Sequence, residues 1–395
     1  MPEFEVKTIS SLEALLDEGP SYDALLDRVR EDWSFYYRAP FLKTYLGLSQ
    51  RKEQLAFFLV FQAETLVAIA PFVLVVQKWS HFWIKRLSFI GTGIKDLANE
   101  YPAILIDPEA DETAVLEALV AFFGSRQADW DQLDLSGLSD SGQFQFFRRW
   151  MKGSKSIELD PGFQTVFTDN LAEVIDRDLP KSRLREVKRL SRKTFRDHPS
   201  AAYHVDHGLT EELFDEIFSL HSARQQEKRH RGAISSQSFF DDPERRRRMK
   251  AKLICLAETC DLRVYRLTIE GRLIAFNLTL RSGSTEYGLF MAFDQAFGSL
   301  SPSKVLMLHI LHLLDEEGVV ATLDHMSGPS MMKKDFCNVE FARFRLVAHN
   351  HGRLISFAKH NCYLATRNTY KFGAARLRAA KKILRPKDTK PAKAA

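Results

Sequence analysis

The chain has 395 residues, of which 45% are apolar and 27% are charged. This length and composition are typical of a globular protein with two or three domains, and they exclude a disordered, collagen-like or membrane-embedded chain. The formal net charge of +5 is uneven, because residues 351–395 hold twelve Lys or Arg against the single acid Asp388. The excess of basic residues therefore belongs to a tail, and we do not expect nucleic acid as a partner.

No segment of the sequence has the length and apolarity of a membrane span. The longest apolar run, residues 66–76, contains Pro71, whereas a spanning helix needs about 20 apolar residues. The first residues have neither the basic nor the apolar region of a signal peptide, so we expect a cytoplasmic protein. The four cysteines form no CxxC pair and no zinc spacing, and we expect reduced, buried thiols and no metal site.

The first half of the sequence contains strands followed by a helix and one further strand. Apolar residues over 55–77, interrupted by a short turn, predict a hairpin, and a strand is predicted at 86–93. A strand near 101–106 precedes a helix over 112–126, and another strand is expected over 131–137.

The second half repeats this order with clearer signals. Three strands between 262 and 293 are joined by turns at Glu270-Gly271 and Ser282-Gly283-Ser284, which predicts an antiparallel meander. A Gly/Ser/Pro stretch then opens a helix over 303–318, and a strand follows over 319–326. The repetition indicates a degenerate internal duplication.

We therefore expect three segments along the chain. A degenerate first domain covers 1–165, a second domain covers 166–350, and a basic helical tail covers 351–395. A basic helix over 179–197 links the two domains, with nine Lys or Arg between 177 and 196. Apolar and basic residues at near-helical spacing in the tail predict peripheral contact with an anionic membrane surface, with packing on the preceding domain as the alternative.

Five short motifs occur in these segments, and we interpret them as one set. In the first, an acidic residue and a tyrosine precede an apolar strand, and the second is the basic helix. The third places His and Arg three residues apart, the fourth starts a helix with Ser-Pro, and the fifth has the spacing Asp-x3-Gly-x4-Lys-x2-aromatic. In sequence order they are IGTGIKDLANEYPAIL with Glu100 and Tyr101, KSRLREVKRLSRK, LFDEIFSLHSARQQEKRHRGAIS with His221 and Arg224, SLSPSKVL, and LDHMSGPSMMKKDF with Asp324, Gly328, Lys333 and Phe336.

These motifs and the order of elements resemble the CelD/BcsL-type acetyltransferases, which have the BioF2-like acetyltransferase domain of the GNAT superfamily. The chain is more distantly similar to Fem-type peptidoglycan aminoacyltransferases. The resemblance implies an α/β (α+β) tandem GNAT fold, with two mixed, largely antiparallel sheets flanked by helices. The chain departs from the family at Gln225, Ser303 and Met332, where an aromatic residue, a glycine and a tyrosine are usual.

The resemblance also implies acetyl-CoA or another acyl-CoA as the co-substrate, bound at the turn that opens the helix over 303–318. A helix N-terminus presents unpaired N–H groups and a partial positive charge, so it can hold a pyrophosphate. A plain connection between strand and helix is the alternative. The residues expected at this cofactor turn are Gly298, Ser299, Leu300, Ser301, Ser303 and Lys304.

Three residues are candidates for catalysis. His221 could take the proton of an attacking ammonium, and the strand-end carboxylate of Asp324 could orient or deprotonate an acceptor. Lys333 could stabilise a developing oxyanion or hold an anionic substrate group. The alternatives are a structural histidine and a surface Asp-Lys pair. His325 is expected on the opposite face of the strand from Asp324.

Tyr101, Arg224 and Gly328 are the expected substrate-binding residues. We interpret the chain as an acyltransferase that moves an acetyl or longer acyl group from acyl-CoA to an amine or hydroxyl. The expected acceptor is a small molecule or a glycan or envelope precursor, in polysaccharide or cell-envelope biosynthesis. The alternatives are a Fem-like transferase that uses aminoacyl-tRNA and a non-catalytic GNAT-fold binding module.

Overall fold

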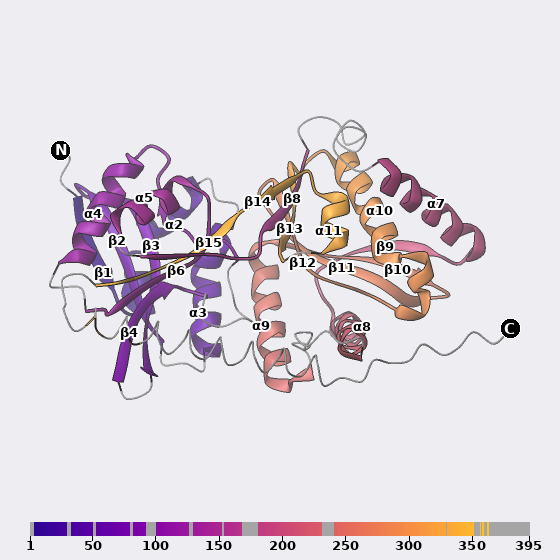
Figure 1. The fold of residues 1–395 in the computed structure, drawn as a ribbon, viewed down its shortest axis with the longest axis horizontal. Coiled ribbons are helices and arrows are strands. Elements are labelled where there is room, and N and C mark those ends of the chain that lie inside the picture. Colours follow the sequence, from indigo (N-terminus) through magenta and orange to yellow (C-terminus); the bar gives the residue numbers. More distant parts are fainter. Residues whose placement is uncertain are drawn as a thin grey trace.

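Two mixed sheets, each flanked by helices, lie side by side in the computed structural model of the chain (Figure 1). We call residues 4–158 the first half and residues 181–341 the second half. The arrangement confirms the predicted α/β class with two mixed, largely antiparallel sheets. The structure describes residues 4–29, 33–49, 53–79, 82–91, 100–125, 129–151, 154–167, 181–230, 241–328 and 330–350, with Ser356, Ala358 and Cys362.

The first sheet has the strand order β1-β2-β3-β4-β6-β15-β7, and β5 pairs with β3. All its pairs are antiparallel except β4 with β6. Its strands are β1 (Phe4–Ile9), β2 (Glu53–Gln62), β3 (Thr65–Trp79), β4 (Phe82–Phe89), β5 (Leu105–Ile106), β6 (Gln132–Ser139), β7 (Lys155–Glu158) and β15 (Arg343–His349). The helices of this half are α1 (Leu12–Asp17), α2 (Gly19–Arg28), η1 (Ser34–Tyr37), α3 (Ala39–Leu48), α4 (Glu112–Gly124) and α5 (Gly142–Trp150).

The second sheet has the order β9-β10-β11-β12-β13-β8-β14, and only β12 and β13 are parallel. Its strands are β8 (Gly162–Val166), β9 (Ala202–His207), β10 (Asp261–Ile269), β11 (Arg272–Ser282), β12 (Thr285–Phe293), β13 (Thr322–Ser327) and β14 (Val339–Phe341). The helices of this half are α7 (Lys181–Asp197), α8 (Glu211–His230), α9 (Pro243–Thr259), η4 (Gln295–Leu300), α10 (Pro302–Glu317) and α11 (Met331–Phe336).

The predicted meander is present as β10, β11 and β12. Glu270 and Gly271 both have positive φ, 53° and 74°, which is the backbone conformation of the tight hairpin turn expected there. A parallel pair needs a crossover connection, and α10 makes that connection between β12 and β13. In the first half, α4 connects the parallel strands β4 and β6 in the same way. Apart from β5, which has no counterpart, the strand orders of the two sheets therefore correspond one to one, as the predicted duplication requires.

The two halves exchange one strand with each other. β8, which follows the first half, lies between β13 and β14 of the second sheet. β15, which follows the second half, crosses back and lies between β6 and β7 of the first sheet (Figure 1). The sheets thus depart from the expected limits of 1–165 and 166–350. The reason is that both exchanged strands pair with residues far away in the chain, which local sequence patterns do not register.

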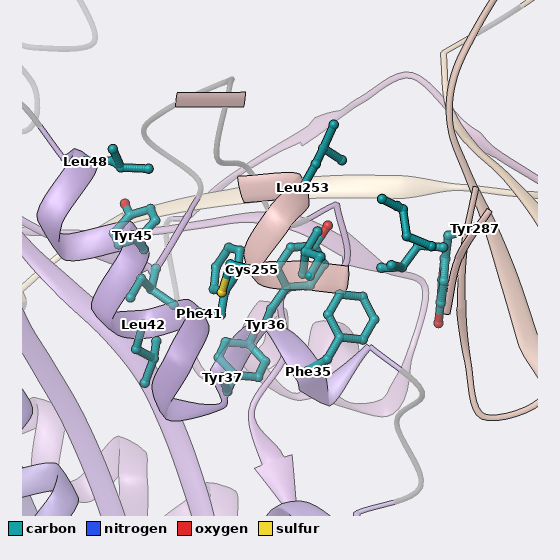
Figure 2. Close-up of a cluster of buried hydrophobic side chains, with 14 of the residues drawn as sticks. Phe35, Tyr36, Tyr37, Phe41, Leu42, Tyr45, Leu48, Leu253, Cys255 and Tyr287 are labelled. Atoms are coloured by element: carbon teal, nitrogen blue, oxygen red, sulfur yellow. The ribbon is translucent and has the colours of Figure 1, made fainter. Parts of the chain in front are cut away.

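One hydrophobic cluster joins the two halves. Aromatic residues of η1 and α3 pack against α9 and against Tyr287 of β12 (Figure 2). Phe35 meets Tyr287 edge-on, with ring centroids 6.1 Å apart, and the ammonium of Lys252 lies 5.2 Å from the ring centroid of Tyr36. The apolar side chains buried in this cluster hold the two halves in a fixed position relative to each other.

Helix α7 packs one stripe of side chains, Leu184, Val187 and Leu190, into the core beside α10. Its eight Lys and Arg residues lie on the remaining surface. No described helix is long and apolar enough to cross a membrane. All four cysteines are free, and Cys255 is buried while Cys362 is exposed. The predicted membrane contact of the tail lies outside the described residues.

Candidate functional site

The parallel strands β12 and β13 part after a short stretch of pairing. They pair over only three positions, 285–287 with 322–324. Just beyond, the register of β12 against β11 shifts at Leu289, which marks a β-bulge, and Met326 of β13 has a positive φ of 61°. Both irregularities turn the strands away from each other, so Asp324 lies at the point of separation.

The carboxylate of Asp324 is buried at this point and accepts three hydrogen bonds. The donors are the hydroxyl of Tyr101 at 2.7 Å, Nε2 of Gln164 at 2.8 Å and the backbone N–H of Met326 at 2.6 Å. Burial raises the pKa of Asp324, and these hydrogen bonds counteract part of that rise. Tyr101 comes from the first half and Gln164 from the exchanged strand β8, so three distant segments build one carboxylate environment.

A cavity of about 660 Å³ opens between the two halves at Asp324. Gln164 and Tyr287 line it beside the carboxylate, and residues 137–143, from the end of β6 to the start of α5, line it from the first half. Gly137 in β6 has a φ of 98°, and a side chain there would meet Pro102 at 2.8 Å, so only glycine fits this close packing.

Glu100 fixes Tyr101 in its place. The carboxylate of Glu100 accepts a hydrogen bond of 2.8 Å from Ser327, which follows Asp324 by three residues. Arg343, the first residue of β15, donates to the carbonyl of Glu100 at 2.6 Å and lies 5.5 Å from the ring centroid of Tyr101. The predicted Glu100-Tyr101 pair therefore meets the predicted Asp324 segment directly.

Lys333 and Gly328 shape the turn that follows Asp324. The ammonium of Lys333 donates to the carbonyls of Met326 at 3.1 Å and Ser327 at 2.6 Å. Burial lowers the pKa of Lys333 to about 8, while the carboxylates of Glu100 and Asp324 counteract that shift. Gly328 has a φ of 93°, and its N–H donates to the carbonyl of Pro161. Neither residue lines the cavity, and their predicted roles toward substrate stay predictions.

His221 lies apart from this cavity, on the buried side of α8. Its ring meets Phe290 edge-on, and its Nε2 is 3.3 Å from Nε2 of Gln225. Burial lowers the pKa of His221 to about 4, so the ring is neutral at pH 7. Its role as a base stays a prediction. His325, as expected, points to the other face of β13, where Nε2 lies 2.8 Å from the hydroxyl of Thr165.

The predicted cofactor turn consists of the end of a short 3-10 helix and the start of α10. Asp294 caps this helix, η4, by accepting from the N–H of Ala296. The side chain of Leu300 is buried in the core, and Ser301 takes a left-handed conformation with a φ of 49° and no capping hydrogen bond to α10. The ammonium of Lys304 is 2.6 Å from the carboxylate of Asp335. Ser299 is exposed, and Gly298 and Ser303 are half-buried.

Arg224 contacts this cofactor turn and does not contact Asp324. Its guanidinium donates to Gln295 at 2.8 Å and to Glu227 at 2.7 Å, and it lies 4.3 Å from the ring centroid of Phe293. These residues line a second cavity, of about 520 Å³, between α8, the end of β12 and η4. The structure thus brings Arg224 together with the expected cofactor turn.

Gln164 and Tyr287 at the first cavity were not predicted from the sequence. Gln164 is a polar residue in an ordinary strand, and only the strand exchange places it opposite Asp324 in register. Tyr287 pairs in register with Asp324 from β12, and the alternation of the meander gave no reason to single it out.

One family model matches most of the second half. Residues 181–334 match the family model described as the acetyltransferase (GNAT) domain. The second half is thus similar to a GNAT acetyltransferase domain. The domain runs from α7 into α11 and contains the parted strands and Asp324. Because the first sheet repeats the strand order of the GNAT domain, the fold is a tandem GNAT fold.

Solved structures share this fold at low sequence identity. The crystal structure of FemX has 11% identity and a TM-score of 0.55, covering 86% of this chain and 96% of FemX. A conserved protein from Bacteroides thetaiotaomicron has 11% identity and a TM-score of 0.51, covering 88% of this chain and 100% of that one. A tandem GNAT protein of clavulanic acid biosynthesis has 11% identity and a TM-score of 0.49, covering 88% and 99%. No curated protein matches the sequence.

Proposed function

We propose that this protein transfers an acyl group from acyl-CoA to an amine or hydroxyl acceptor bound between its two halves. The observation that supports this most is the position of Asp324. A buried carboxylate lies where the two parallel strands of the GNAT domain part, and it faces a cavity to which both halves contribute.

Asp324 would act as the general base. An amine or hydroxyl must lose its proton as it attacks, and a carboxylate whose pKa is raised by burial is a stronger base than an exposed one. Tyr101 and Gln164 hold the carboxylate in one orientation by their hydrogen bonds. Lys333 would act on the reaction through the backbone of Met326 and Ser327, as a positioning residue.

Acyl-CoA would supply an activated acyl thioester. The residues at the expected cofactor turn fit its pyrophosphate, because α10 has sixteen residues and directs its positive end toward the turn. The acids beside the turn are already paired, Asp294 with Arg272 and Asp335 with Lys304. Ser301 and Ser303 would then contribute backbone and hydroxyl groups to the phosphates.

The cavity favours a neutral or cationic acceptor. Among the described residues that line it are three acids and no Lys or Arg. Trp33, Tyr101, Tyr287 and Phe341 add aromatic faces to the same lining. Acidic and aromatic side chains together suit sugars and amino sugars, which agrees with the CelD/BcsL-like motifs and with a glycan precursor as acceptor.

The second candidate is a Fem-like transferase that takes its aminoacyl group from tRNA. The exposed face of α7 favours it, because eight Lys or Arg there are balanced only by Glu186 and Asp197. A third candidate, a non-catalytic binding module, would retain the fold without the chemistry.

Calorimetry and an assay of released CoA thiol distinguish these functions. We expect the full chain to bind acetyl-CoA or a longer acyl-CoA, and to release CoA in the presence of amino sugars. Asp324→Asn should retain acyl-CoA binding and lose turnover. Binding of tRNA with steep salt dependence, together with no affinity for any acyl-CoA, would favour the Fem-like reaction. Binding of acyl-CoA without turnover on any acceptor of a broad amine and sugar panel would favour the non-catalytic module.

A further inference from the structure

Asn277, in the middle of β11, has a buried side-chain amide without a hydrogen-bond partner in the described part of the chain. The residue is only 2% exposed, and both Oδ1 and Nδ2 are unpaired. An amide offers two donors and one strong acceptor, and buried polar side chains are paired in the large majority of cases. A fully unpaired amide at such a position therefore needs an explanation.

The next polar side chains along β11 on the same side of the sheet as Asn277 are paired. Thr279, two residues further along β11, is fully buried and donates to Glu286 at 2.7 Å. Arg281, two residues beyond Thr279, donates to the other oxygen of Glu286 at 2.8 Å. Within β11 the lack of partners is thus confined to Asn277, and across the sheet the buried hydroxyl of its register partner Tyr265 on β10 is also without one among the described residues.

The amide of Asn277 lies beside the point where β12 and β13 part. A Cβ atom on Gly288 would be 4.0 Å from Oδ1 of Asn277 and 3.4 Å from the carbonyl of Asp324. Gly288 directly follows Tyr287, the last residue of β12 that pairs with β13, and it directly precedes the bulge at Leu289. The glycine therefore leaves the amide open toward the separating strands.

The side chains of Asn277 and Asp324 lie on opposite faces of the sheet. Ala275, which shares its side of β11 with Asn277, packs in the cluster formed with α10. Tyr287, the register partner of Asp324, packs in the cluster that joins the two halves. The amide thus lies on the face of α10 and of the expected cofactor turn, whereas the carboxylate faces the acceptor cavity.

We propose that the amide of Asn277 hydrogen-bonds the acylated end of the pantetheine arm of acyl-CoA. The NH2 group of Asn277 can donate to the thioester carbonyl or to an amide carbonyl of the pantetheine arm. Its Oδ1 can accept from an amide N–H of the arm. This inference rests on the proposed function and adds a donor-binding residue to it.

The test uses full-length protein with Asn277→Leu and, as a smaller replacement, Asn277→Ala. Leucine has the same branched shape as asparagine, larger terminal groups and no polar atoms, so it removes the amide without leaving a cavity. We expect the affinity for acetyl-CoA, measured by calorimetry, to fall at least tenfold, which corresponds to about 1.4 kcal/mol. We also expect Asn277→Leu to unfold in urea at the same or a higher midpoint than wild type, because loss of an unpaired buried amide sacrifices no hydrogen bond.

Thr279→Val is the matched control on the same strand and face. It removes a hydroxyl that is paired, so it should lower the urea midpoint and leave the affinity for acetyl-CoA unchanged. Wild-type affinity for acetyl-CoA in both Asn277 variants would overturn the inference while the proposed function stands. A lower midpoint of Asn277→Leu, like that of the control, combined with unchanged affinity would show an internal structural role. If the wild-type protein binds no acyl-CoA, the proposed function fails, and this inference fails with it.

Discussion

At the scale of single residues, the ionisation of Asp324 determines when the proposed base is active. A general base must be unprotonated, so the rate should fall as the pH drops through the pKa of Asp324, which burial raises. The hydroxyl of Tyr101 counteracts that rise by donating to the carboxylate. We expect Tyr101→Phe to move the acid limb of kcat/KM to higher pH, and Asp324→Asn to lower kcat/KM by about a hundredfold or more.

The pH profiles of kcat/KM for the acceptor in wild type and both variants, measured with saturating acyl-CoA, check this prediction. Acyl-CoA affinity is the internal control, because neither change touches the expected cofactor turn. An acid limb at the same pH in wild type and Tyr101→Phe would contradict the coupling between the two side chains.

His221 makes a separate prediction about stability. Its pKa is lowered by burial from the ordinary 6.5 to about 4, so the unfolded chain binds a proton more readily than the folded chain between these values. Stability is therefore complete above pH 6.5 and decreases as the pH falls toward 4, by up to about 3 kcal/mol for this residue. We expect His221→Gln to flatten the fall in unfolding free energy over that range, as measured by urea titration at several pH values.

His312→Gln is the control for removing a histidine, since His312 is exposed on α10. If His221→Gln and wild type lose the same free energy between pH 6.5 and 4, the buried ring of His221 does not cause the acid sensitivity. His325, whose pKa burial lowers to about 3, should account for part of any remaining slope.

The sequence was informative about some residues of the site and silent about others. Asp324 and Tyr101 were predicted separately from two motifs, and their contact across 223 positions could not be read from local patterns. Asn277 was not singled out, because a polar residue in a strand shows neither its burial nor its lack of partners until the neighbouring strands are in place. Residue types at strand ends were predictable, whereas pairings between distant segments were not.

At the scale of elements, the start of α10 is expected to hold the pyrophosphate. Ser303 lies in the first turn of this helix, where a carboxylate interacts favourably with the positive end of the helix. Ser303→Glu should therefore preserve or raise thermal stability, and it should weaken acyl-CoA binding at least tenfold by placing negative charge against the phosphates. Ser303→Lys, at the same position and of similar length, should bind acyl-CoA at least as tightly as wild type. Equal affinities of the two variants would exclude this helix start as the phosphate site.

The elements themselves were largely predictable, and their partners were not. The hairpin, the meander and α10 follow from alternation, turn residues and helix ends that are local in the sequence. The 3-10 helix η4 was not predicted in the Gly/Ser/Pro stretch before α10. It forms where the carboxylate of Asp294 caps the turn and the side chain of Leu300 is buried.

At the scale of the whole molecule, the strand exchange ties the stability of each half to the other. β15 lies inside the first sheet although it follows the second half in sequence, and β8 lies inside the second sheet. The shared cluster of η1, α3 and α9 adds apolar burial between the halves. Neither sheet can lose its exchanged strand without exposing interior positions such as Leu346, which is fully buried. We therefore expect the two halves to unfold together.

The tryptophans make this cooperativity measurable. All five tryptophans, at positions 33, 79, 83, 130 and 150, lie in the first half, so their fluorescence reports on that half and, through Trp33, on its contact with the second half. Leu311, on α10, lies in the core of the second half and is fully buried. Leu311→Ala should destabilise that core by about 2–5 kcal/mol. Because the halves share strands, we expect it to lower the urea midpoint of tryptophan fluorescence and of far-UV circular dichroism by the same amount.

An unchanged fluorescence midpoint with a shifted or biphasic circular dichroism transition would mean that the halves unfold independently despite the exchange. Lys188→Ala, on the exposed face of α7 in the same half, is the control and should move neither midpoint.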